Sequence, residues 1–234
     1  MKKLLIVLIP LFICSVIYIC SFSAVRYIST SKNPINNHPI IIIDAGHGGF
    51  DGGAVAEDGT VEKNINLKIS EYLQEYLIFF GFNTIMTRET DDSIEDAGLQ
   101  TIRERKSSDL HNRMKIMEET ENALFISIHQ NKYSIEKYSG TQVFYSPKTK
   151  EESSLLAQSI QDSIVNTLQK DNIRQIKECG TSVFLMYNAV KPAVLVECGF
   201  LSNYEETKLL NNPEYQKKIA FCIAIGIQDY ICKG

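Results

Sequence analysis

Four ionisable side chains in this sequence have the types and positions that metal-dependent hydrolysis requires. Three of them come at or just beyond the end of a short apolar run that is typical of a buried strand: His47, His129 and Glu197. The fourth, Glu62, follows a glycine-rich stretch and opens a segment with helical periodicity. Two imidazoles and a carboxylate are the ligand set of a catalytic zinc ion that keeps one position open, and a second carboxylate can act as general base. The spacing alone does not decide which three bind the metal.

Each of these residues also has an ordinary structural interpretation. A single histidine after a strand is more often a satisfied structural residue than a metal ligand. Glu62 could simply complement the positive end of a helix, and Glu197 could pair with a basic side chain. The catalytic interpretation is favoured over the structural one because all four residues are expected at the same edge of the predicted sheet.

The elements that must position these residues alternate between strand-like and helix-like runs. Strands are expected at 40–44, 83–87, 123–129, 141–145, 182–186 and 193–197, and helices at about 65–80, 99–120, 151–169 and 213–232. This alternation predicts an α/β fold with a single three-layer domain, in which helices flank a mostly parallel central sheet. We expect an N-terminal hydrophobic helix to precede that domain.

The N-terminus differs in composition from the rest of the chain. Lys2 and Lys3 precede residues 4–25, a run of 22 residues without a charge. A basic start and an apolar run of this length are typical of an export signal or a membrane span. The alternatives are a cleaved signal and a buried core helix, and we favour an uncleaved anchor.

The expected division of the chain follows from this composition: a signal or transmembrane anchor at 1–26, a polar linker at 27–38 and the catalytic domain at 39–234. The protein is therefore expected to be exported, and to be anchored in the membrane or secreted on its extracytoplasmic side. A net charge of −4 argues against a nucleic-acid partner. The six cysteines form no CxxC pair, which argues against a thiolate metal site.

Five blocks of the sequence, in the same order and over about 160 residues, resemble the zinc-dependent N-acetylmuramoyl-L-alanine amidases of the third amidase type. The blocks are IIIDAGHGGFDGGAV at 41–55, VEKNINLKI at 61–69, MTRETD at 86–91, LFISIHQN at 124–131 and PAVLVECGFLSN at 192–203. The resemblance implies that one zinc ion per domain is held by His47, Glu62 and His129, with Glu197 as the catalytic base. Gln130 and Cys198 depart from the residues commoner in that family, but no expected ligand is missing.

The resemblance also implies the substrate. Family members cleave the amide bond between N-acetylmuramic acid and L-alanine in peptidoglycan, so the expected partners are glycan strands and their stem peptides. The compact domain and the membrane-type N-terminus look most like the spore-cortex amidases. These strip peptides from muramic acid so that muramic δ-lactam can form, which places the expected site of action around the developing spore. Several relatives are controlled by partner proteins, so a protein activator is a further expectation.

Two more residues are candidates for binding substrate. Arg88 follows a predicted strand and could bind a peptide carboxylate, or it could pair with Glu89, Asp91 or Asp92. Asn131 lies close to His129 and could orient a ligand or the substrate.

Two other functions compete with the amidase interpretation. A thiol peptidase would use Cys198 as its nucleophile, but Cys198 directly follows Glu197 on a strand, so their side chains should point to opposite faces. A membrane-tethered, non-catalytic or partner-activated peptidoglycan-binding protein is the second alternative. The presence of all four candidate residues argues against the non-catalytic alternative, because a protein without catalytic activity would not need the complete set.

Overall fold

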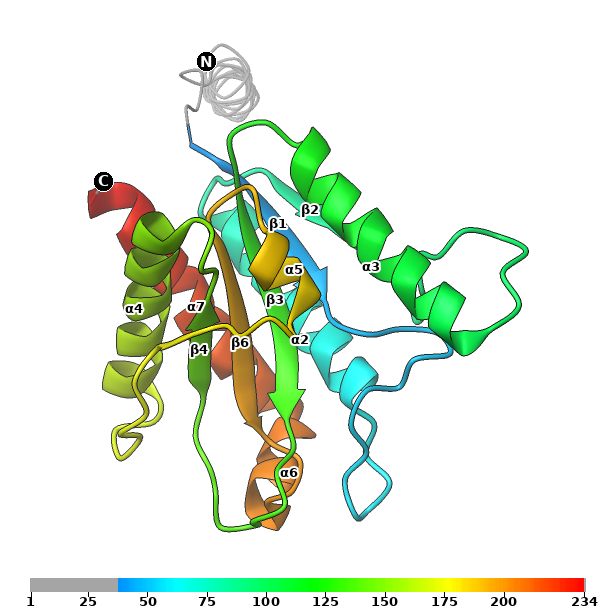
Figure 1. Ribbon diagram of the computed structural model, residues 1–234. Coiled ribbons are helices and arrows are strands. Elements are labelled where there is room, and N and C mark those ends of the chain that lie inside the picture. Colours follow the sequence, from blue (N-terminus) through cyan, green and yellow to red (C-terminus); the bar gives the residue numbers. More distant parts are fainter. Residues whose placement is uncertain (1–37, 234) are drawn as a thin grey trace, which may run out of the picture. The chain divides into compact units, whose positions relative to one another are not determined.

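The computed structural model describes residues 38–233, which contain a single α/β domain built on one six-stranded sheet (Figure 1). The predicted signal or anchor at 1–26 and nearly all of the linker lie outside the described residues. The strands are β1 (Ile40–Ala45), β2 (Thr84–Met86), β3 (Ala123–Asn131), β4 (Gln142–Tyr145), β5 (Lys177–Glu178) and β6 (Ala193–Phe200), in the spatial order β2-β1-β3-β6-β4-β5. All neighbouring strands run parallel except β4 and β6, which are antiparallel. The predicted mostly parallel sheet is confirmed.

Helices cover both faces of the sheet and make the three predicted layers. They are α2 (Glu62–Phe79), α3 (Ile102–Glu119), α4 (Lys150–Thr167), α5 (Phe184–Asn188), α6 (Tyr204–Leu210) and α7 (Pro213–Lys233). The helices α2, α4 and α7 pack together on one face of the sheet, and α3 and α5 pack on the other; in Figure 1, α7 passes behind the sheet and α5 lies in front of it. The larger hydrophobic core lies between the sheet and α2, α4 and α7, and a smaller core lies under α3 and α5. Within residues 38–233, no helix combines the length and apolar character needed to cross a membrane.

The alternation of side chains along the central strands decides which residues reach which layer. On β6, Val194, Val196 and Cys198 belong to the larger core, whereas Ala193 and Leu195 belong to the smaller one. The same alternation holds on β3, so His129 and Glu197 both fall on the side of the sheet that α3 and α5 cover. These two residues are also direct partners in the β3–β6 register.

One predicted strand is wrong. Residues 182–186 have the apolar pattern of a strand, but the chain turns at 181–182 and then forms the short helix α5. The four apolar residues at 183–186 do not separate a short strand from one turn of helix, because the run is too short for its periodicity to be measured. The sequence pattern also did not predict the helix α6 or the two-residue strand β5.

Candidate active site

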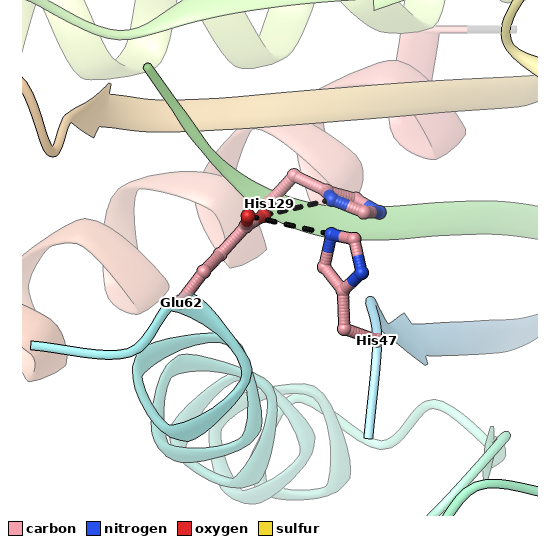
Figure 2. A group of neighbouring side chains, drawn as sticks. All are labelled: His47, Glu62 and His129. Carbon is pink, nitrogen blue, oxygen red and sulfur yellow. Dashed lines mark hydrogen bonds and ion pairs between the residues drawn. The ribbon is translucent and has the colours of Figure 1, made fainter. Parts of the chain in front are cut away.

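His47, Glu62 and His129 meet at the carboxyl ends of β1 and β3 (Figure 2). One potential ligand atom from each residue lies within 4.8 Å of the others. The Glu62 carboxylate lies between the two rings: Oε2 is 3.3 Å from Nε2 of His47, and Oε1 is 3.0 Å from Nδ1 of His129. The three residues come from the β1–α2 loop, the first residue of α2 and the strand β3, so only the folded chain brings them together.

Close backbone approach explains the glycines around His47. A Cβ atom on Gly46 would lie 2.3 Å from Nε2 of His129, and one on Gly53 would lie 2.5 Å from Oε2 of Glu62. His47 itself has a φ of 63°, a left-handed conformation that is uncommon for a residue with a side chain. Such strain persists only where the surroundings enforce it and is typical of functional sites.

Backbone and side-chain donors hold the Glu62 carboxylate in place. Oε2 accepts a hydrogen bond from Ala54 N–H at 2.7 Å, and Oε1 accepts one from Gln130 N–H at 3.0 Å. Asn66, one turn along α2, donates to Oε1 at 3.3 Å. Burial would raise the pKa of Glu62, but hydrogen bonds and the charges of the two histidines outweigh it and hold that pKa well below its usual range. The buried carboxylate is therefore ionised and fixed.

A second carboxylate orients His47 from the other side of its ring. Asp51 Oδ2 lies 3.0 Å from Nδ1 of His47, and its Oδ1 pairs with Lys106 of α3 at 2.9 Å. Burial opposes the charged imidazole, but the hydrogen bonds from His47 to Asp51 and Glu62 prevail and raise the pKa of His47 to about 9. This site thus attracts positive charge, and the ring is turned so that Nε2 points to Glu62.

Glu197 lies beside His129 and carries an unsatisfied oxygen. Its Oε2 atom is buried and has no hydrogen-bond partner among the described residues. Desolvation is the main cause that raises the pKa of Glu197 to about 7, and the negative charge of Glu62 adds to it. A carboxyl group with a pKa near neutrality can accept and return a proton. Cys198 points into the opposite core and is fully buried, as the strand alternation predicted.

Arg88 is built into the loop rather than held open for a ligand. It is buried, and its guanidinium donates four hydrogen bonds to backbone carbonyls: those of Ala45 at 2.8 Å, Thr90 at 2.9 Å, Gly46 at 3.2 Å and Lys63 at 2.8 Å. The structural interpretation is therefore favoured, although the partners are carbonyl groups and not the acidic residues that follow Arg88.

A buried ionic network below the loop was not predicted from the sequence. Arg113 of α3, 1% exposed, donates to Asp44 Oδ1 at 2.6 Å, to Asp109 Oδ2 at 2.7 Å and to the His47 carbonyl at 2.8 Å. Ser127 also donates to Asp44 at 2.5 Å. The available signal was an aspartate directly after four isoleucines, together with the Asp109–Arg113 spacing of one helical turn.

The space in front of the site is a pocket of about 220 Å³. Its lining includes His47, His129, Asp51, Lys106 and Arg113. Asn131 lies at the end of β3, beyond an irregularity in the register, and its carbonyl accepts a hydrogen bond from Leu201 N–H at 2.7 Å. The structure thus places Asn131 near the edge of the site but not in the three-residue cluster.

Comparison with known proteins matches this geometry to one family. The N-acetylmuramoyl-L-alanine amidase family of the third type matches residues 41–229. The germination-specific N-acetylmuramoyl-L-alanine amidase of Bacillus subtilis is 40% identical over 191 residues, which cover 82% of this chain and 79% of that protein. The CwlD amidase from Clostridioides difficile, solved in complex with the GerS lipoprotein, is 41% identical with a TM-score of 0.81, and the match covers 84% of this chain and 100% of that one.

A more distant structure shows the same fold. An N-acetylmuramoyl-L-alanine amidase from Clostridium difficile 630 is 28% identical with a TM-score of 0.72, over 85% of this chain and 100% of that one. The match of the family covers the loop with His47, the start of α2 and the strands that carry His129 and Glu197. The chain therefore belongs to the N-acetylmuramoyl-L-alanine amidase family and is an enzyme of that family.

Proposed function

We propose that this enzyme hydrolyses the amide bond between N-acetylmuramic acid and L-alanine in peptidoglycan with the help of one zinc ion. The observation that carries the proposal is the cluster of His47, Glu62 and His129, with the buried carboxyl group of Glu197 one strand away. Family membership supports the reaction, and the cluster supports the cofactor.

The residues fit a zinc ion in chemistry and in number. Two imidazoles and one carboxylate form a three-residue donor set that leaves a fourth tetrahedral position open, as in catalytic zinc sites. Asp51 behind His47 matches the usual second partner of a metal-binding imidazole. A Cβ atom on Gly46 or Gly53 would clash with these side chains, which supports a loop shaped closely around the proposed donor set.

The chemistry divides between the ion and Glu197. A bound zinc ion polarises the amide carbonyl and makes a water molecule more acidic. Glu197, whose pKa near 7 suits both halves of the task, takes the proton from the attacking water and returns it to the leaving L-alanine nitrogen. Its buried Oε2 atom, without a partner among the described residues, is the one that we assign to this proton.

The thiol-peptidase alternative is not supported by the geometry. Cys198 is fully buried in the core on the far side of the sheet, and burial strongly raises the pKa of its thiol. A nucleophilic cysteine needs access and a lowered pKa. The non-catalytic alternative is less favoured because the donor set and Glu197 are all present and mutually oriented.

We assign the enzyme a role in removing stem peptides from spore cortex, as a step toward muramic δ-lactam. The similarity to the germination-specific amidase supports this role. The matching CwlD structure contains the GerS lipoprotein, which supports a protein partner for this chain as well. We also propose export, with residues 1–26 as an anchor or signal and 39–234 as the catalytic domain, so that the site acts outside the cytoplasmic membrane.

The experiment that tests the reaction uses the full chain, purified in detergent and supplied with zinc, with intact peptidoglycan as substrate. Mass spectrometry should detect released peptides that begin with L-alanine, and removal of zinc by a chelator should stop their release. A zinc-loaded protein that releases no such peptide, with and without a candidate partner protein, would contradict the proposed reaction.

A further inference from the structure

The β3–β4 loop, residues 132–141, carries exposed tyrosine rings directly after the second histidine strand. Tyr133 is 53% exposed and Tyr138 is 38% exposed, although both are large aromatic side chains. Their ring centroids lie 5.4 Å apart, and the Tyr138 ring lies 6.3 Å from that of Phe200 at the end of β6. We name Tyr133 and Tyr138 the tyrosine pair. A large aromatic ring that stays exposed beside a catalytic edge contributes little to the core and is available to a ligand.

Short contacts tie this loop to the active site. Lys132 donates from Nζ to the carbonyl of Val55 at 2.7 Å, and Val55 follows Ala54, whose N–H binds the Glu62 carboxylate. On the other side, Tyr133 N–H donates to the hydroxyl of Ser202 at 3.2 Å. The loop that carries the tyrosine pair is therefore tied on one side to the backbone next to the Glu62 contact and on the other side to the segment that follows β6.

Arg174 packs against one member of the tyrosine pair, Tyr138. Its guanidinium carbon lies 4.5 Å from the Phe200 ring centroid and 5.6 Å from that of Tyr138, and its Nε donates to the Ser139 carbonyl at 2.7 Å. Tyr138 and Arg174 also line a hollow of about 680 Å³ together with polar side chains, including Asn172 and Glu206. This volume is in the range of about 300–1,000 Å³ that is typical of small-molecule sites.

We propose that the tyrosine pair binds sugar rings of the glycan strand, on the side of the cleaved muramic acid residue that faces the β3–β4 loop. This inference rests on the proposed function, because it assumes that the substrate is a sugar polymer. Pyranose rings present C–H groups that pack on aromatic faces, and their hydroxyl groups suit tyrosine hydroxyls and amide side chains. The hollow beside the tyrosine pair is rimmed by Lys137, Lys170 and Arg174, whose N–H groups can donate to the oxygen atoms of a glycan strand. Tyrosine and arginine are also common in protein interfaces, so a protein partner is the competing occupant that the binding experiment must separate.

Binding to peptide-free glycan strands tests the proposal without turnover. The parent protein is the full chain with Glu197→Gln, and the probe is a fluorescent strand of alternating N-acetylglucosamine and N-acetylmuramic acid. Added Tyr133→Ala or Tyr138→Ala should each raise the Kd about tenfold, whereas Tyr133→Phe or Tyr138→Phe, which keep the ring, should stay within about threefold. The matched control is Phe79→Ala: it removes an 84% exposed ring at the far end of α2, about 25 Å along the helix from Glu62, and should leave the Kd unchanged.

Three outcomes would overturn the proposal: a parent protein that does not bind the strand, alanine variants that bind as tightly as the parent, or phenylalanine variants as weak as the alanine ones. If all variants bind the glycan strand as tightly as the parent protein, the tyrosine pair would instead be assigned to the binding of a protein partner. If an alanine variant is unfolded by circular dichroism, the same comparison is made with Tyr138→Leu or Tyr133→Leu. Because the assay needs no hydrolysis, wild-type enzyme that releases no L-alanine peptides would refute the proposed function separately from this inference.

Discussion

His129 and Glu197 are direct neighbours across the parallel strands β3 and β6, and both face the side of the sheet that α3 and α5 cover. Because of this pairing, the buried Oε2 atom of Glu197 lies next to the three-residue cluster although the two residues are far apart in the sequence. The strand register, and not a flexible loop, sets their separation. The proposed division of labour between a ligand and a proton carrier depends on this relationship.

The first prediction concerns the proton carrier. Glu197→Gln keeps the size of the side chain but removes its ability to take a proton, so peptide release should fall by about 100-fold or more. Zinc content, measured by elemental analysis of the same sample, should stay at one ion per chain because Glu197 is outside the donor set. Near-normal turnover in a zinc-loaded variant would remove Glu197 from the mechanism.

The second prediction concerns the pH dependence of wild-type activity. The pKa of Glu197 is about 7 without metal, and the base must be ionised, so kcat/KM should rise with pH and level off above that value. A nearby cation favours the carboxylate, so the observed pKa should lie at or below 7 once zinc is bound. Rates over about pH 5 to 9, at saturating zinc, measure this limb. An acid limb centred well above 7 would contradict the assignment.

The third prediction concerns metal affinity. The pKa of His47 is about 9, so near neutral pH a metal ion must displace a proton from this ring. Competition with a chelator should therefore show the zinc Kd decreasing about tenfold per pH unit toward pH 9. Asp51→Asn removes a contact that raises this pKa, so the dependence should flatten, while the affinity near pH 9 falls by about 10- to 100-fold. Equal slopes for the two proteins would show that Asp51 does not control His47.

The fourth prediction separates close packing from general glycine effects. Gly46→Ala would place a methyl group 2.3 Å from Nε2 of His129, so the ring must move and both zinc binding and activity should be lost. Gly180→Ala is the matched control, because its added Cβ would meet no atom within 4 Å. Zinc content and thermal unfolding of the two variants make the comparison. A Gly46→Ala protein with full zinc and normal activity would contradict the close fit of this loop around His129.

The fifth prediction concerns the buried network under the loop. Arg113→Met leaves the carboxylates of Asp44 and Asp109 without their guanidinium partner, so the free energy of unfolding should fall by about 3–5 kcal/mol. Arg103→Met on the exposed side of the same helix should change it by less than about 0.5 kcal/mol. Urea denaturation followed by circular dichroism measures both. Similar stabilities for the two variants would show that the network does not hold the fold.

Part of the fold can be predicted from the local pattern of apolar residues. The continuous apolar runs at 40–43 and 193–196 predicted strands that the sheet buries on both faces, because only such strands need no polar alternation. The pattern at 182–186 predicted the wrong element for a different reason. Its four apolar residues satisfy the packing needs of either a strand or a helical turn, and the contacts under α5 decide between the two.

The sequence by itself determined the chemical types at the site, the glycines around His47 and the opposite orientation of Glu197 and Cys198, because these depend on neighbouring residues. Only the tertiary structure decided that potential ligand atoms of His47, Glu62 and His129 lie within 4.8 Å of one another. It also decided that Arg88 donates hydrogen bonds to backbone carbonyls and that Arg113 forms an ion pair with Asp44. Most of those contacts bridge segments far apart in the chain; the exceptions are the contact between His47 and Glu62 and the one from Arg88 to the Thr90 carbonyl. They follow from the spatial order β1-β3-β6 and the packing of α3, which no local pattern encodes.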